Sequence, residues 1–220
     1  MGRFFLAATF ACVVILVVAA GPVGADDQLT CGGAPATIVG TGNGATIYGT
    51  DGPDVIVGTT GADTIYGLGG DDLVCGAPDQ ATVADQGDHI YGGEGDDSLA
   101  GGGFSGEEGA PPNKLPDGND VLDGGPGNDF ATGMTGNDTV IGGNGDDEVF
   151  GGPGNDNVSG GNGDDIVVGN FGNDTLTGDN GDDLLDGDIV AEDGPAQDPL
   201  PNVDSCDGGR GANQLFYCNP

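Results

Sequence analysis

Basic residues are nearly missing from this sequence. The 220-residue chain has three Lys and Arg against 37 Asp and Glu, which gives a formal net charge of -34. With so few cations no basic patch can meet phosphates, so nucleic acid is a poor partner and anionic membrane surfaces are excluded. Cations are the natural partners of such a chain.

The residues that fill an ordinary globular core are also scarce. Trp is absent and aromatic residues make up 5% of the chain, whereas Gly contributes 49 residues. This composition predicts either disorder or a periodic structure that is held by something other than side-chain packing.

The first 25 residues differ from the rest. Their only charge is Arg3, and an almost unbroken apolar run extends from Phe4 to Ala20. The small residues Val23-Gly24-Ala25 then precede Asp26. This pattern predicts a signal peptide over 1–25 and a secreted, extracellular protein. A retained anchor is the alternative, because about 17 apolar residues are the lower limit of a membrane span. No later segment could cross a bilayer.

Four cysteines follow the predicted signal peptide: Cys31, Cys75, Cys206 and Cys218. An even count in an exported chain predicts two disulfide bonds, for which three connectivities are possible. Position favours Cys31–Cys75 and Cys206–Cys218, one near each end. Free thiols or metal ligands are the alternative, although the spacings do not resemble a zinc site.

A nine-residue repeat dominates the second half of the chain. Residues 115–186 align without gaps as eight units of the form GGxGxDxUx, in which U is a large apolar residue. Aspartate fills the sixth position of every unit: Asp120, Asp129, Asp138, Asp147, Asp156, Asp165, Asp174 and Asp183. At the eighth position only Ala131 is small.

The same repeat occurs earlier in interrupted form. Four units cover 40–75, with Ala45, Asp54, Asp63 and Asp72 at the sixth position, and two more cover 83–100, with Asp88 and Asp97. Residues 76–82 and 101–114 are insertions whose Pro and Gly residues indicate loops. We expect the second insertion to be a hinge between two stacks.

One unit has a definite physical interpretation. Its first six residues, as in Gly142–Asp147, contain glycines that permit a tight turn with inward carbonyl oxygens. The last three form a short strand whose middle, aliphatic residue faces inward. Two units therefore make one coil, and stacked coils pair their strands in parallel over a ladder of Val, Ile and Leu.

Stacking brings each aspartate near its counterpart in the next coil, where like charges repel. A polyvalent cation would turn this repulsion into attraction. Carboxylate and carbonyl oxygens, without His or thiolate, suit multiple Ca²⁺ ions, which tolerate six to eight irregular oxygen ligands. Mg²⁺ demands stricter octahedral geometry.

The units GGNGDDEVF, GGPGNDNVS and GGNGDDIVV resemble the hemolysin-type, or RTX, calcium-binding nonapeptide. The resemblance implies an all-β, right-handed parallel β-roll (a solenoid) with calcium-filled turns on both edges. It also implies metal binding by sixth-position aspartates: Asp54, Asp63, Asp72, Asp97, Asp120, Asp129, Asp138, Asp147, Asp156, Asp165, Asp174 and Asp183.

In the family a second loop, one coil along, completes each site. The implied pairs join Asp120 with Asp138, Asp129 with Asp147, and so on to Asp165 with Asp183. In the first block Asp54 pairs with Asp72, and Asp63 has no in-phase partner beyond Cys75. Asp88 and Asp97 form a single coil and are weaker candidates.

These features divide the chain into five parts. We expect a signal peptide at 1–25, an N-terminal cap and short roll at 26–100, and an inserted loop at 101–114. The main roll follows at 115–186, and a C-terminal cap with a disulfide bond occupies 187–220. The tail SCDGGRGANQLFYC is interpreted as a lid on the last coil, because the ends of a solenoid need covering.

No catalytic constellation is apparent. His89, the single histidine, falls at an outward position, so no Ser-His triad is expected. A ladder of identical carboxylates lacks the two contrasting environments of a glycosidase pair. We therefore predict a secreted calcium-binding protein with a structural or binding role and no enzymatic activity. The alternatives are a scaffold attached to an exported toxin or enzyme, a calcium-dependent adhesin, and a disordered acidic chain. The sequence identifies no protein or glycan partner.

Overall fold

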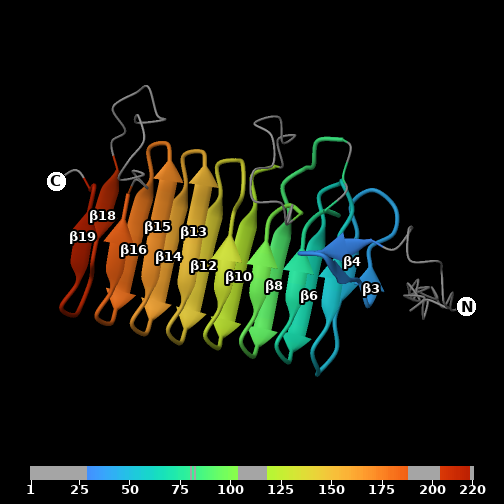
Figure 1. Cartoon of the computed structure of the whole chain (residues 1–220), viewed down its shortest axis with the longest axis horizontal. Coiled ribbons are helices and arrows are strands. Elements are labelled where there is room, and N and C mark those ends of the chain that lie inside the picture. The colour runs from blue at the N-terminus through green and yellow to red at the C-terminus, as the bar shows by residue number, and fades with distance from the viewer. Residues whose placement is uncertain (1–28, 80, 82, 104–117, 188–203, 219–220) are drawn as a thin grey trace, which may run out of the picture.

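The computed structural model describes residues 29–79, 81, 83–103, 118–187 and 204–218. The predicted signal peptide at 1–25 lies outside the described residues. The described chain is a stack of coils whose colour runs continuously from one end to the other (Figure 1). Among these residues, no helix has the length and hydrophobicity needed to cross a membrane.

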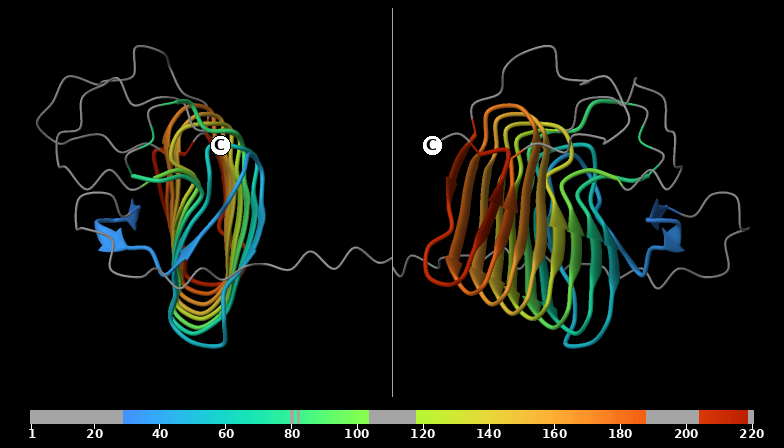
Figure 2. Two further views of the ribbon diagram at one scale, coloured as in Figure 1. Left: turned by 90° about the vertical axis from the view of Figure 1, so that its right-hand side faces the viewer. Right: turned by 60° about the vertical axis from the view of Figure 1, so that its left-hand side comes forward.

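Two parallel sheets form the walls of the stack. Within the described residues one sheet has eight strands, in the order β18-β16-β14-β12-β10-β8-β6-β4. Their bounds are Ser205–Asp207 (β18), Thr175–Asn180 (β16), Asn157–Asn162 (β14), Thr139–Asn144 (β12), Val121–Pro126 (β10), His89–Glu94 (β8), Thr64–Gly69 (β6) and Thr46–Tyr48 (β4). Seen along the stack, the two sheets face each other as the sides of a flattened coil (Figure 2).

In the part of the chain that the structure describes, the opposite sheet has nine strands, in the order β19-β17-β15-β13-β11-β9-β7-β5-β3. Their bounds are Gln214–Phe216 (β19), Leu184–Asp186 (β17), Ile166–Phe171 (β15), Glu148–Pro153 (β13), Phe130–Thr132 (β11), Ser98–Ala100 (β9), Leu73–Cys75 (β7), Val55–Val57 (β5) and Ile38–Val39 (β3).

Strand register follows the nonapeptide. In the main block Val140 of β12 lies opposite Val158 of β14, and Val149 of β13 lies opposite Val167 of β15. Each strand therefore pairs with the strand two units further along the chain, because one coil consists of two units. The prediction of an all-β parallel β-roll is confirmed.

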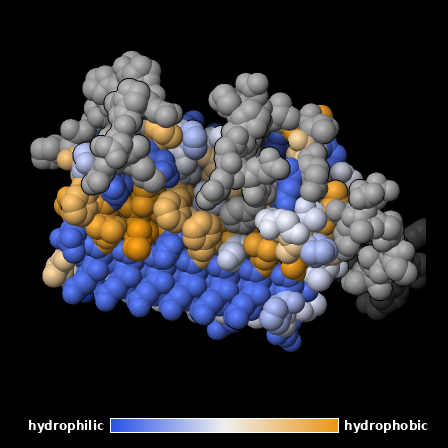
Figure 3. Space-filling view, in the orientation of Figure 1, coloured by the Kyte–Doolittle hydropathy of each residue, from blue (hydrophilic) through white to orange (hydrophobic). Residues whose placement is uncertain are grey.

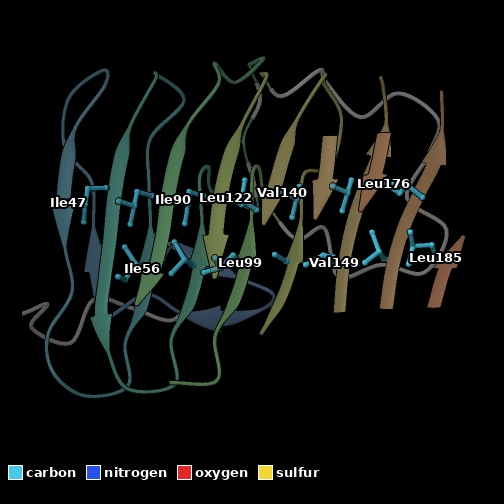
Figure 4. Close-up of a cluster of buried hydrophobic side chains, with 14 residues drawn as sticks. Ile47, Ile56, Ile90, Leu99, Leu122, Val140, Val149, Leu176 and Leu185 are labelled. Carbon is cyan, nitrogen blue, oxygen red and sulfur yellow. The ribbon is translucent and has the colours of Figure 1, made fainter. Parts of the chain in front are cut away.

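The core is a double row of eighth-position side chains between the sheets (Figure 4). From Ile56 to Leu185 these side chains are fully buried, and the small Ala131 is buried as completely as its neighbours. The middle residue of each short strand points inward because successive side chains of a strand point to opposite faces. The core is thus one residue wide in each sheet.

Neither insertion interrupts the sheets. β6 pairs with β8 and β7 with β9 across residues 76–82. β8 pairs with β10 and β9 with β11 across 101–114. The expectation of a hinge that divides two stacks is therefore wrong. A loop that leaves and re-enters at the same point of a coil keeps the register, and the entropy of closing it grows only slowly with its length.

A small hairpin packs against β5 and β7 of the nine-stranded sheet. β1 (Thr30–Cys31) pairs antiparallel with β2 (Ala34–Pro35). The Cys31–Cys75 disulfide joins this hairpin to the nine-stranded sheet, with 5.6 Å between the two Cα atoms. Both cysteines are buried in a separate apolar cluster that includes Val57 and Ala100.

The C-terminal segment is a further coil. β18 extends the eight-stranded sheet beside β16, and β19 extends the nine-stranded sheet beside β17. The described part of the predicted C-terminal cap thus continues both ladders of strand pairing, and its role as a lid on the last coil stays a prediction. The Cys206–Cys218 disulfide is present, so both favoured cysteine pairings are confirmed.

Candidate metal centres

Sixth-position aspartates form two buried ladders, one at the start of each sheet's strands. The first ladder precedes the eight-stranded sheet: Asp63, Asp88, Asp120, Asp138, Asp156, Asp174 and Asp204. The second ladder precedes the nine-stranded sheet: Asp54, Asp72, Asp97, Asp129, Asp147, Asp165 and Asp183. All fourteen are between 0% and 9% exposed.

One carboxylate oxygen of each aspartate helps to join the coils. The backbone N–H of Asp120 donates to Oδ1 of Asp138 at 2.8 Å, and the N–H of Asp129 donates to Oδ1 of Asp147 at 2.7 Å. The same bond joins every implied pair of the main block, up to Asp165 and Asp183. The structure thus brings the predicted partners together at a spacing of one coil.

The other carboxylate oxygen, Oδ2, has a different environment. In eight ladder aspartates Oδ2 is buried and has no hydrogen-bond partner among the described residues: Asp72, Asp88, Asp97, Asp129, Asp147, Asp156, Asp165 and Asp183. A buried charged oxygen without a partner is costly, and native proteins rarely repeat such a defect. The repetition indicates that a cation is the missing partner of these oxygens.

Backbone oxygens surround the same place. A Cβ atom on Gly142 would lie 2.5 Å from Oδ2 of Asp147 and 2.6 Å from the carbonyl oxygen of Gly160. Only glycine therefore fits here, between a carboxylate oxygen and a carbonyl oxygen of the next coil. No group of three or more His, Cys, Asp or Glu side chains gathers within the described residues, so most ligands of an ion would be backbone oxygens. Such a set suits Ca²⁺.

Burial changes the acidity of the ladders. It raises the pKa of Asp88 to about 9 and the pKa values of Asp97 and Asp147 to about 7. The pKa values of Asp72, Asp129, Asp156 and Asp165 rise to about 6 for the same reason. Carboxylates in adjacent coils add to the shift at Asp147, and its bond from the Asp129 N–H opposes it. These seven turns therefore favour a positive partner, either a proton or a metal ion.

Fifth-position residues form a second, exposed ladder beside the buried one. The N–H of Asp146 donates to Oδ1 of Asn128, and the N–H of Asp164 donates to Oδ1 of Asp146, both at 2.9 Å. These bonds run toward the preceding coil, whereas the buried bonds run toward the next. Figure 3 shows a hydrophilic band along one edge of the stack, beside a more hydrophobic band. The fifth-position side chains thus serve the contact between coils.

Three ladder positions, Asp88, Asp204 and Asn213, were not assigned as ligands from the sequence. Asp88, a weaker candidate, is fully buried and accepts the N–H of Asp63 at 2.7 Å, so the expectation that Asp63 lacks an in-phase partner is wrong. Asp204 and Asn213 accept the N–H groups of Asp174 and Asp183 at 2.9 and 2.7 Å. The unit GGRGANQLF, with Asn at its sixth position, was the signal for this last coil.

Asp54 and Asp63, at the N-terminal end of the ladders, have a different environment. Both oxygens of each carboxylate have hydrogen-bond donors in the described residues. These two predicted ligands therefore lack the orphaned oxygen that marks the turns from Asp72 onward.

Stacked parallel coils whose glycine turns present a buried carboxylate and backbone oxygens define a calcium-binding β-roll. The chain belongs to the RTX calcium-binding nonapeptide repeat family. The model of this family, which describes four copies of the repeat, matches residues 48–83, 84–106, 117–131, 123–158 and 159–189. No curated protein matches the chain.

Proposed function

We propose that this protein is an exported calcium-binding protein whose β-roll folds when Ca²⁺ fills its turns. The observation that carries the proposal is the row of buried Oδ2 atoms without hydrogen-bond partners, such as those of Asp129 and Asp147. A metal ion supplies the missing positive partner for each oxygen. It also joins successive coils, whose acidic side chains otherwise repel one another.

Calcium ions fit the turns of the roll better than magnesium ions do. The turns offer carboxylate and carbonyl oxygens in irregular positions, and Ca²⁺ accepts six to eight such ligands. The proposed ligands are the predicted aspartates from Asp72 onward, together with Asp88 and Asp204. Extracellular calcium modules bind with dissociation constants of about 10⁻⁴–10⁻³ M, so we expect folding at millimolar calcium.

Export is supported by two independent features. The apolar N-terminal segment has the pattern of a signal peptide, and the two disulfide bonds suit an oxidising compartment. Cleavage before Asp26 gives a mature chain whose N-terminal residue can be tested. The protein recovered from the medium should begin at Asp26 in N-terminal sequencing, and an intact Met1 in a membrane fraction would instead favour the anchor.

We assign the roll a structural or binding role without catalysis. His89 is exposed on β8, and the buried carboxylates are engaged in joining coils. The twin ladders repeat one environment, whereas acid–base catalysis needs two groups whose pKa values are pushed apart.

Circular dichroism tests the proposal directly, since the absence of Trp removes the usual fluorescence signal. The purified protein in EGTA should lack most of its β signal and gain it cooperatively as Ca²⁺ reaches millimolar concentration. Isothermal titration should count several ions, and Mg²⁺ at the same concentration is the control. A β signal that is already complete in EGTA at low ionic strength would contradict the proposal.

A further inference from the structure

The turns of Asp54 and Asp63, near the N-terminus, have threonine at the second position of the unit, where several later units have glycine. The N–H of Thr50 donates to Oδ2 of Asp54 at 2.8 Å, and its hydroxyl donates to the same oxygen at 2.9 Å. Thr59 repeats the arrangement: its N–H donates to Oδ2 of Asp63 at 2.5 Å and its hydroxyl to Oδ1 at 3.1 Å. The carboxylate oxygens that are orphaned elsewhere are satisfied here.

The backbone explains why these two turns differ. In many later turns the second residue has a positive φ, as in Gly143 at 122° and Gly161 at 118°. A β-branched residue is strongly disfavoured in that region, and neither Thr50 nor Thr59 adopts it. Their peptide groups consequently turn the N–H toward the aspartate. Leu68, in the next turn, has a φ of 83°, and there the Oδ2 of Asp72 lacks a hydrogen-bond partner.

A calcium ion does not fit the threonine turns. The lone pairs of Asp54 and Asp63 that would face a cation already accept N–H and O–H hydrogens, and these partial positive charges repel a cation. Thr37 also donates from its hydroxyl to Oδ1 of Asp54 at 3.3 Å, and the Ala45 N–H donates to Oδ1 of Asp63. Alanine replaces aspartate at the sixth position of the preceding unit, at Ala45.

The same end of the molecule has its own sources of stability. The Cys31–Cys75 disulfide joins cysteines that are 44 positions apart, and both threonine turns lie between them. Ala36 and Val57 are buried with these cysteines, and Ile47, Ile56 and Ile65 supply bulky side chains to the core. The N-terminal coils thus combine a covalent link, an extra apolar cluster and satisfied carboxylates.

We propose that residues 31–66 form a metal-independent template on which the calcium-dependent coils assemble. In this arrangement, which rests on the proposed function, the threonines take the place of calcium at Asp54 and Asp63. The template stays folded when calcium is removed and presents the edges of β5 and β6 to the strands that follow. Assembly then proceeds from the N-terminal coils toward the C-terminus.

Hydrogen exchange of the full protein in EGTA and in calcium tests the template. Amides of β5 and β6 should stay protected in EGTA, whereas amides of β12 to β16 should exchange freely and become protected only with calcium. Equal, fast exchange of both regions in EGTA would overturn the inference. The proposed function would survive that outcome, because it depends only on whether calcium produces the β signal.

A double variant, Thr50→Val with Thr59→Val, isolates the hydroxyl groups. Valine keeps the β-branched shape and removes the O–H bonds, so exchange of β5 and β6 amides in EGTA should accelerate by on the order of tenfold or more. Thr177→Val, on an outward position of β16, is the matched control and should leave their exchange unchanged. Circular dichroism in calcium verifies that each variant still folds. Unaltered protection in the double variant would show that the threonines do not hold the template.

Discussion

The N-terminal coils and the main stack share one backbone plan but satisfy their buried carboxylates differently. In the turns of Asp54 and Asp63, threonine donors occupy the carboxylate oxygens. In the main stack, as at Asp147 and Asp165, one oxygen has no hydrogen-bond partner among the described residues. In the two threonine turns the β-branched side chain at the second position goes with a φ outside the positive region and with a hydrogen-bonded carboxylate, whereas Leu68, at a φ of 83°, precedes an Asp72 whose Oδ2 has no partner.

Chelation should separate the two regions most strongly. With EGTA at neutral pH, chymotrypsin should cleave after Phe130 and Phe150 in the unfolded main stack and spare Tyr48 and Tyr66 in the template. With calcium, all four sites should resist. Mass spectrometry of the fragments measures the pattern, and early cleavage at Tyr48 in EGTA would remove the difference between the regions.

Lowering the pH in EGTA should partly replace calcium in the main stack. Burial raises the folded pKa values of Asp147 to about 7 and of Asp156 and Asp165 to about 6, above the value near 3.9 of an unfolded chain. The folded state then binds more protons, so its added stability is fully present below about pH 4 and is lost as the pH rises through 6 to 7.

Circular dichroism in EGTA at pH 4.5 and pH 7.5 should therefore show more β structure at the lower pH. With calcium present, the trend should reverse, because protons compete for the same oxygens and the apparent calcium affinity falls below pH 7. A calcium affinity that does not change between pH 7.5 and pH 6 would argue against binding by these buried carboxylates.

Removal of the disulfide bonds should destabilise the template more than the last coil. By loop-closure entropy the Cys31–Cys75 link, with a sequence separation of 44, contributes about 4 kcal/mol, and the Cys206–Cys218 link, with a separation of 12, contributes about 3 kcal/mol. Urea unfolding in EGTA of the Cys31→Ala/Cys75→Ala and Cys206→Ala/Cys218→Ala variants measures the difference. Only the first variant should lose the chelator-resistant exchange protection of β5 and β6.

Single aspartate substitutions should have the smallest effects, and they compare the regions residue by residue. Asp147→Ala removes a proposed ligand and leaves the Asp129 N–H unpaired, at a cost of about 1–3 kcal/mol in calcium. The exposed neighbour Asp146→Ala, which loses one surface bond, is the matched control. Titration calorimetry should count fewer ions for Asp147→Ala and an unchanged number for Asp54→Asn. Loss of an ion in Asp54→Asn would place calcium in the threonine turns.

Much of the fold was predictable because the repeat is strict. A period of nine with an apolar eighth residue predicts two inward-facing strands per coil, and Val140 and Val149 lie where that rule places them. The disulfide pairing followed from the positions of the cysteines near the two ends. These features depend on local spacing, which the sequence displays directly.

The continuity of the ladders was harder to predict. Asp63 meets Asp88 and Asp97 meets Asp129 across insertions, at separations of 25 and 32 residues instead of 18. A period search treats each insertion as a break, because no sequence pattern states where a loop re-enters. Asp204 escaped assignment for the same reason, since residues 187–203 separate it from the last regular unit.

The sequence by itself determined the coil: its period, its inward aliphatic row and its turns rich in oxygen ligands, because each follows from the steric and hydrogen-bonding preferences of nine neighbouring residues. Only the tertiary structure decided which aspartates face each other and which keep an oxygen without a donor. That outcome depends on contacts between coils and on the φ angle at the second position, as the contrast between Thr50 and Gly143 demonstrates.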